Sequence, residues 1–179
     1  MKDSPITLSD RVRNLTGGLM TRLGNTLADL GIHPDFITVF GLGLVGIAAW
    51  FIGNGDLRLG GVILLLGLPL DAVDGAVARA MKRTDRFGEM LDSSLDRYAD
   101  GFIFAALSYH FAVEDRFTLM LAALAALVGS YMVSYTRARA EGIDVVVKIG
   151  WFTRLERVAV ILVMLLVPAL MGLPVLEVG

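Results

Sequence analysis

Residues 57–80 read LRLGGVILLLGLPLDAVDGAVARA, an apolar run that turns acidic in its second half. The run is long enough to cross a bilayer, which takes roughly 20 apolar residues in an α-helix. Asp71, Asp74 and Ala78 follow one another at offsets of three and four residues, so they share one face of the predicted helix. The segment therefore predicts a membrane helix with an acidic site near one end.

A second acidic segment follows after a short basic turn. Residues 88–96 read GEMLDSSLD, in which Gly88, Asp92 and Asp96 repeat every four residues and share a helix face. Two consecutive antiparallel helices can bring this face against the acidic face of the preceding helix. Four carboxylates would then surround one cavity. They belong to Asp71, Asp74, Asp92 and Asp96.

Carboxylates this close repel one another, and burying an ionised aspartate near a membrane is costly unless it is paired. A cation must therefore lie among them. Oxygen ligands in a chain without cysteine favour Mg²⁺, Mn²⁺ or Ca²⁺ over zinc. Mg²⁺ usually engages a few carboxylates together with substrate phosphates, so such a site has room for a diphosphate. Gly75, Ala78 and Gly88 remove bulk beside the carboxylates, and Arg79 is well placed to meet a phosphate.

The composition supports a membrane protein. Apolar residues make up 55% of the 179 residues, and the mean hydropathy is +0.67, too high for a typical soluble domain. The net charge of −2 excludes the basic surface typical of a nucleic-acid binder. Five segments approach the length of a bilayer crossing. They are residues 36–52, 57–80, 87–113, 117–135 and 155–173, and a sixth crossing could begin within residues 175–179.

An amphipathic helix precedes these segments. Large apolar residues recur at helical spacing from Leu8 to Leu30, with charged residues mostly between them, which is typical of a helix lying at a membrane surface. Gly31 and Pro34 favour a stop there. We therefore predict an all-α polytopic membrane bundle of five to six transmembrane helices in residues 34–179, preceded by an N-terminal amphipathic surface helix in residues 1–33.

The distribution of basic residues predicts the orientation. If the N-terminus is cytoplasmic, only Arg58 and Arg116 fall in outside loops, and the positive-inside rule is satisfied. The acidic cluster then also faces the cytoplasm of the cell. The basic residues on the cytoplasmic side are Lys82, Arg83, Arg86, Arg137, Arg139, Lys148, Arg154 and Arg157.

The acidic pattern resembles the full signature of the CDP-alcohol phosphotransferase family, at all eight of its positions. The signature residues here are Asp71, Asp74, Gly75, Ala78, Arg79, Gly88, Asp92 and Asp96. The resemblance implies that the four aspartates hold two Mg²⁺ ions, with Mn²⁺ as the alternative, and that Asp96 is also the general base. It implies a CDP-binding set of Asp74, Gly75, Ala78, Arg79, Thr84 and Gly88. It further implies a CDP-linked lipid donor, six transmembrane helices in a bilayer and a homodimer.

One departure from the family concerns the start of the first crossing. Family members often carry Pro-Asn-x-x-Thr there, whereas this chain reads Pro34-Asp35-Phe36-Ile37-Thr38, with aspartate in place of asparagine.

Arginines at the ends of the last two segments indicate the acceptor. Arginine forks suit a phosphate dianion, which favours a phosphorylated acceptor over simple anchoring of helix ends. The run from Tyr135 to Glu141 and the later Glu156-Arg157 pair resemble the phosphatidylinositol phosphate synthases and their archaeal relatives, which implies inositol 1-phosphate as the acceptor. By this resemblance the phosphate-binding residues are Arg137, Arg139, Arg154 and Arg157.

Two other functions stay open on the residues alone. Glycerol 3-phosphate would need the same kind of phosphate pocket, which would make the chain a phosphatidylglycerophosphate synthase. A cation transporter also carries acidic residues within a bundle, but it favours polar or broken helices near the bilayer midplane rather than carboxylates at one end.

Overall fold

The computed structural model describes residues 8–83, 86–145 and 154–170. All regular elements within these ranges are helices, which confirms the predicted all-α class. The helices are α1 (Leu8–Asp29), α2 (Pro34–Gly53), α3 (Leu57–Ala80), α4 (Arg86–Val113), α5 (Phe117–Glu141) and α6 (Arg154–Leu170).

A helix occurs at each of the five predicted membrane segments. Helix α3 has the predicted bounds, and α2 and α4 differ from theirs by one or two residues. Helix α5 runs to Glu141, beyond the predicted end at Tyr135, because the arginines and alanines that follow are good helix formers. The last part of the predicted fifth crossing, and the start of a sixth, lie outside the described residues.

Three of these helices are long and apolar enough to cross a membrane: α2, α3 and α5. Helix α2, the shortest of them with 20 residues, spans about 30 Å, the thickness of the hydrocarbon core. Helix α4 is longer still, with 28 residues, but Asp92 and Asp96 lie in its first half and Asp100 lies just past its midpoint. Because of these charges, α4 does not qualify as a transmembrane helix by its length and composition alone.

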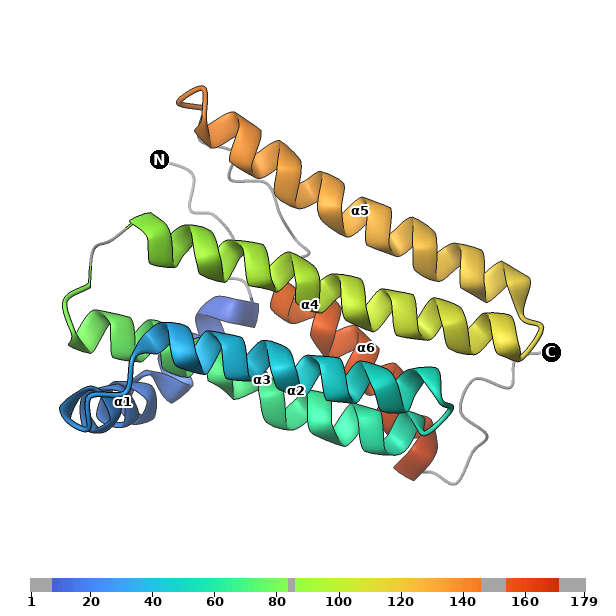
Figure 1. Cartoon of the computed structure of the whole chain (residues 1–179), viewed down its shortest axis with the longest axis horizontal. Coiled ribbons are helices and arrows are strands. Elements are labelled where there is room, and N and C mark those ends of the chain that lie inside the picture. The colour runs from blue at the N-terminus through green and yellow to red at the C-terminus, as the bar shows by residue number, and fades with distance from the viewer. Residues whose placement is uncertain (1–7, 84–85, 146–153, 171–179) are drawn as a thin grey trace.

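Helices α2, α3 and α4 form the centre of the bundle, where α2 packs against both neighbours (Figure 1). Helix α6 packs on α3, whereas α5 packs on α4 alone among the described helices. At Gly60 of α3, a Cβ atom would lie 2.5 Å from Cγ1 of Ile52 and 2.9 Å from the carbonyl oxygen of Ala48. Because this glycine has no side chain, α2 and α3 meet at backbone distance.

Helix α1 ends where the sequence predicts. Gly31 adopts a φ of +75°, and its N–H donates to the carbonyl of Ala28, while Ile32 donates to Leu27. A left-handed glycine after the last turn is a common helix stop, because glycine has no Cβ to clash there. Helix α2 then begins at Pro34, whose fixed φ suits the first position of a helix.

Helix α1 supports the part of α3 that carries the first two aspartates. A Cβ on Gly24 would lie 2.7 Å from the backbone carbon of Ala76, so the two helices touch at that point. Met20 and Leu27 pack against the cluster of buried residues between α2 and α3. Leu19 and Leu23 stay exposed, as expected of a helix that also meets lipid. The surface location of this helix and the division into residues 1–33 and 34–179 stay predictions.

Candidate active site

Three of the four predicted carboxylates meet between α3 and α4. One carboxylate oxygen from each of Asp71, Asp92 and Asp96 can be chosen so that all three lie within 4.8 Å of one another. Like charges at this separation repel strongly unless a cation lies between them. The donor set is all oxygen, which fits Mg²⁺ or Mn²⁺. The residues present therefore fit a divalent metal site.

Asp74 takes a different position from the other three. Its side chain is buried, and its Oδ2 accepts a hydrogen bond of 2.8 Å from the Oγ1 of Thr38 on α2. Its Oδ1 accepts the backbone N–H of Gly75. Asp74 still lines a cavity with Asp71 and Asp96, so it borders the cluster without joining the group of three.

The arrangement of three carboxylates plus one follows from helix geometry. Residues three apart on a helix are offset by about 60° around its axis, because each residue turns by about 100°. Asp71 can therefore face α4 while Asp74 faces α2. Thr38 ends the stretch of residues 34–38, which resembles the family's Pro-Asn-x-x-Thr motif. In the structure, its hydroxyl group donates a hydrogen bond to Asp74.

A cavity of about 250 Å³ opens beside the cluster, between the start of α2, the end of α3 and the start of α4. A Cβ on Gly75 would lie 3.3 Å from the Nη1 of Arg79, so the missing side chain leaves room for that guanidinium. Thr84, the remaining residue predicted to bind CDP, lies outside the described residues. The predicted CDP-binding residues that line the cavity are Asp74, Gly75, Ala78, Arg79 and Gly88.

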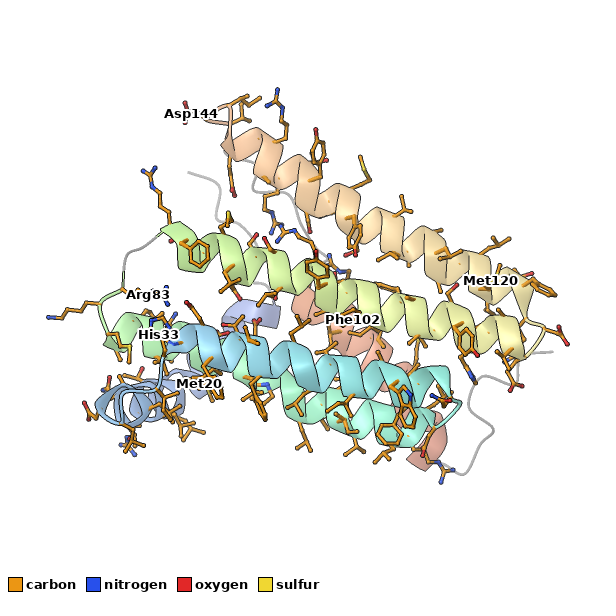
Figure 2. All side chains as sticks on the ribbon, viewed as in Figure 1. Met20, His33, Arg83, Phe102, Met120 and Asp144 are labelled. Carbon is orange, nitrogen blue, oxygen red and sulfur yellow. The ribbon has the colours of Figure 1, made fainter. Side chains whose placement is uncertain are left out.

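Asp35 and Arg83 line this cavity and bind each other. The guanidinium of Arg83 binds both carboxylate oxygens of Asp35, at 2.5 Å and 3.0 Å, and it lies 3.4 Å from the Nδ1 of His33. Figure 2 shows Arg83 and His33 together at the end of the bundle where α2 begins. The aspartate that departs from the family's asparagine thus joins α2 to the turn after α3. Local spacing does not predict this pair, because its members lie 48 positions apart in the chain.

A second cavity, of about 290 Å³, lies on the other side of the cluster, between α4, α5 and α6. Two of the four arginines predicted to bind the acceptor phosphate, Arg137 and Arg157, line it. Arg139 is exposed and does not line it, and the side chain of Arg154 lies outside the described residues. The other polar residues of the lining are Asp92, Ser93, Asp96, Arg97, Asp100, Ser134 and Glu141.

Arg97 and Asp100 are lining residues that sequence reasoning missed. Asp100 could have been found, because it continues the four-residue interval of Gly88, Asp92 and Asp96 by one more turn of the same helix face. Arg97 lies just outside that pattern, and its guanidinium donates to the carbonyl and hydroxyl oxygens of Ser93.

The carboxylate cluster separates the two cavities. Asp92 lines both of them, and Asp96 lines the second cavity together with Arg137 and Arg157. A group bound in the first cavity would therefore meet a group bound in the second across the aspartates. This arrangement suits transfer of a group between two molecules, with metal ions held at the point of transfer.

Comparison with known proteins agrees with this interpretation of the site. The family model described as CDP-alcohol phosphatidyltransferase matches residues 31–177. The chain is 40% identical over 122 residues to the archaetidylinositol phosphate synthase of Pyrococcus horikoshii, covering 68% of this chain and 62% of that protein. It is 36% identical over 148 residues to the phosphatidylinositol phosphate synthase of Streptomyces avermitilis, covering 81% and 61%. The chain thus spans somewhat less than two thirds of these two relatives.

A solved structure has the same fold. The phosphatidylinositol phosphate synthase of Mycobacterium tuberculosis, in a crystal structure with CDP-DAG bound, superposes with a TM-score of 0.78 at 32% identity. The match covers 87% of this chain and 79% of that one. A second crystal structure of the same enzyme, in complex with manganese and citrate, also gives a TM-score of 0.78.

Proposed function

Because the chain belongs to the CDP-alcohol phosphatidyltransferase family, we propose that it transfers a phosphatidyl-type group from a CDP-linked lipid to inositol 1-phosphate and releases CMP. The observation that carries the proposal is the position of the carboxylate cluster, which lies between a cavity with Arg79 and a cavity with Arg137 and Arg157. The match to the family model confirms the resemblance that the sequence shows to this family.

The donor would bind in the cavity between α2, α3 and α4. Arg79 would neutralise part of its diphosphate, and Gly75 and Ala78 would let the nucleotide approach the α3 backbone. A neighbour crystallised with CDP-DAG supports a CDP-lipid donor. CDP-diacylglycerol and CDP-archaeol differ only in their lipid tails, and both fit the proposal.

The metal site would consist of Asp71, Asp74, Asp92 and Asp96 and would hold two Mg²⁺ ions, or Mn²⁺ in their place. The cluster of three carboxylates and the manganese complex of the neighbour support divalent metal binding. Asp74 keeps free lone pairs beside its two hydrogen bonds, since a carboxylate accepts about four. The chemistry supplied by bound cations is neutralisation of the diphosphate and polarisation of the phosphorus under attack.

The reaction itself needs one proton transfer. Asp96 would accept the proton of the acceptor hydroxyl as the hydroxyl oxygen forms its bond to phosphorus and the bond to CMP breaks. Asp96 suits this role because it belongs to the carboxylate cluster and also lines the cavity that would hold the acceptor. CMP then leaves and a phosphodiester remains.

The acceptor would bind in the cavity between α4, α5 and α6. Arg137 and Arg157 would bind its phosphate. Arg154, whose side chain lies outside the described residues, stays a predicted third ligand, whereas Arg139 does not line this cavity. Serine, aspartate and glutamate side chains in the lining offer partners for the hydroxyl groups of a polyol. A transporter is not supported, because the family is one of transferases.

In the presence of Mg²⁺, purified protein in detergent should release CMP from CDP-DAG at least about tenfold faster with inositol 1-phosphate than with unphosphorylated inositol. Unphosphorylated inositol cannot form the charge-assisted hydrogen bonds that the phosphate makes, and their loss would weaken its binding by that factor or more. Glycerol 3-phosphate and serine serve as competing acceptors. Preference for glycerol 3-phosphate would change the acceptor assignment, and no CMP release with any acceptor would refute the transferase.

The protein is a multi-pass membrane protein, and we propose that its N-terminus and active site face the cytoplasm. The basic residues near the cluster support this orientation. Because the chain has no cysteine, a cysteine placed at Asn54 or Gly142 gives a single label site on either side. In intact cells, a membrane-impermeant thiol reagent should label the Asn54→Cys variant and spare Gly142→Cys. The reverse result would invert the orientation.

The homodimer stays a prediction, which crosslinking in native membranes would test.

A further inference from the structure

Asp100 connects three helices below the carboxylate cluster. It lies one turn beyond Asp96 on α4, and its side chain is almost fully buried. Its Oδ2 accepts a hydrogen bond of 2.8 Å from the Nη2 of Arg157 on α6 and another from the Oγ of Ser130 on α5. One carboxylate oxygen thus joins α4, α5 and α6 at the edge of the proposed acceptor cavity.

Arg157 reaches the cavity from this ion pair. Its side chain keeps 18% of its surface exposed, and it lines the cavity together with Arg137. Its Nε is buried and has no hydrogen-bond partner among the described residues. A guanidinium has five N–H donors, so the hydrogen bond to Asp100 leaves others available for an anion.

The charge of Asp100 is matched by Arg157 rather than needed for a metal. Asp100 does not belong to the group of three clustered carboxylates. An ion pair between a buried carboxylate and a partly buried guanidinium is costly to break, because the remaining carboxylate would lose its compensating charge. Asp100 and Arg157 therefore act as one unit at this end of the cavity.

We propose that Asp100 is a positioning residue that holds the guanidinium of Arg157 in place for the phosphate of the acceptor. This inference depends on the proposed function of the cavity. Asp92 and Asp96 line the same cavity and would attract an arginine released from Asp100. Without the Asp100 carboxylate, Arg157 would turn toward those aspartates and away from the acceptor phosphate. Removal of the Asp100 charge thus weakens acceptor binding, although the additional uncompensated positive charge would by itself attract the acceptor phosphate.

The test is the Asp100→Asn variant in the full-length protein, with CMP release as the readout. The KM for inositol 1-phosphate should rise at least about tenfold, the effect of losing a well-placed charge-assisted hydrogen bond. The KM for CDP-DAG should stay within about twofold of wild type, because the donor cavity does not include Asp100. A rise in both KM values by the same factor would indicate a general structural role and overturn the proposal.

Ser130→Ala is the matched control. It removes the other hydrogen bond to the same Asp100 oxygen and leaves the ion pair with Arg157 intact. Under the proposal its KM for the acceptor stays within about threefold of wild type, since a neutral hydrogen bond contributes little. If Ser130→Ala and Asp100→Asn change the acceptor KM equally, Asp100 acts by joining helices and not through Arg157.

A second pair of variants covers the case in which Asp100→Asn does not fold. Replacing both members of a buried ion pair is usually better tolerated than replacing one. The acceptor KM of Asp100→Asn/Arg157→Met should equal that of Arg157→Met within about twofold, because Asp100 acts only through Arg157. A further large change in the double variant would overturn the proposal.

The wild-type protein separates this inference from the proposed function. If wild type uses another phosphorylated acceptor in place of inositol 1-phosphate, only the acceptor identity falls, and the same KM comparison is made with that acceptor. If wild type releases no CMP with any acceptor, the proposed function and the role of Asp100 are both refuted. An active wild type with an unchanged acceptor KM in Asp100→Asn refutes the role of Asp100 alone.

Discussion

Asp96→Asn is expected to lower the rate of CMP release by about 10²- to 10⁴-fold at saturating Mg²⁺, the range that a general base contributes. The amide of asparagine cannot accept the proton of the acceptor hydroxyl. It can still offer an oxygen to a metal ion, so CDP binding should persist. Activity is measured as CMP release, and CDP binding by calorimetry in the presence of Mg²⁺.

The same substitution at Asp115 is the matched control. Asp115 is an exposed residue in the turn between α4 and α5, with a φ of 56° that asparagine also tolerates. Asp115→Asn should keep the wild-type rate. A rate close to wild type in Asp96→Asn would remove the assignment of Asp96 as the base. Loss of CDP binding together with the rate would make Asp96 chiefly a metal ligand.

Asp71→Asn should raise the Mg²⁺ concentration needed for half-maximal CMP release by at least about tenfold, because the proposed metal site would lose one of its charged ligands. Excess Mg²⁺ should recover much of the activity, in contrast to Asp96→Asn. In the wild-type protein, a chelator should abolish CDP binding, since Arg79 would not offset the repulsion between the diphosphate and the carboxylates without metal ions. Calorimetry with and without the chelator measures this effect.

Asp115→Asn again serves as the control, with an unchanged requirement for Mg²⁺. An unchanged requirement in Asp71→Asn would exclude Asp71 from the metal site. CDP binding that survives chelation would separate the nucleotide site from the carboxylate cluster. If wild-type protein takes up neither metal ion nor CDP, the proposed reaction has no chemical basis.

The residue pattern alone determined the bundle and the core of the site. Residues 57–80 predicted α3 with its bounds, and Gly31 predicted the stop after α1. Intervals of three and four residues placed Asp71, Asp92 and Asp96 on faces that meet. These features follow from local helix periodicity and chain connectivity, which a sequence states directly.

The same periodicity explains where the acceptor prediction was too broad. Arg137 lines the cavity between α4, α5 and α6, but Arg139 does not. Residues two apart on a helix point about 160° away from each other, so both arginines cannot face one cavity. Helix geometry could therefore have separated these two arginines before the structure did.

Only the tertiary structure decided the partners of the charged residues. Thr38 binds Asp74, Arg83 binds Asp35, and Arg157 binds Asp100. These pairs lie 36, 48 and 57 positions apart in the chain. Such contacts depend on how far each helix is rotated about its axis and where it crosses its neighbours. Close packing at small residues such as Gly24 and Gly60 sets those rotations and crossings. A one-dimensional pattern does not contain them, because each rotation is the joint result of many weak packing contacts between helices.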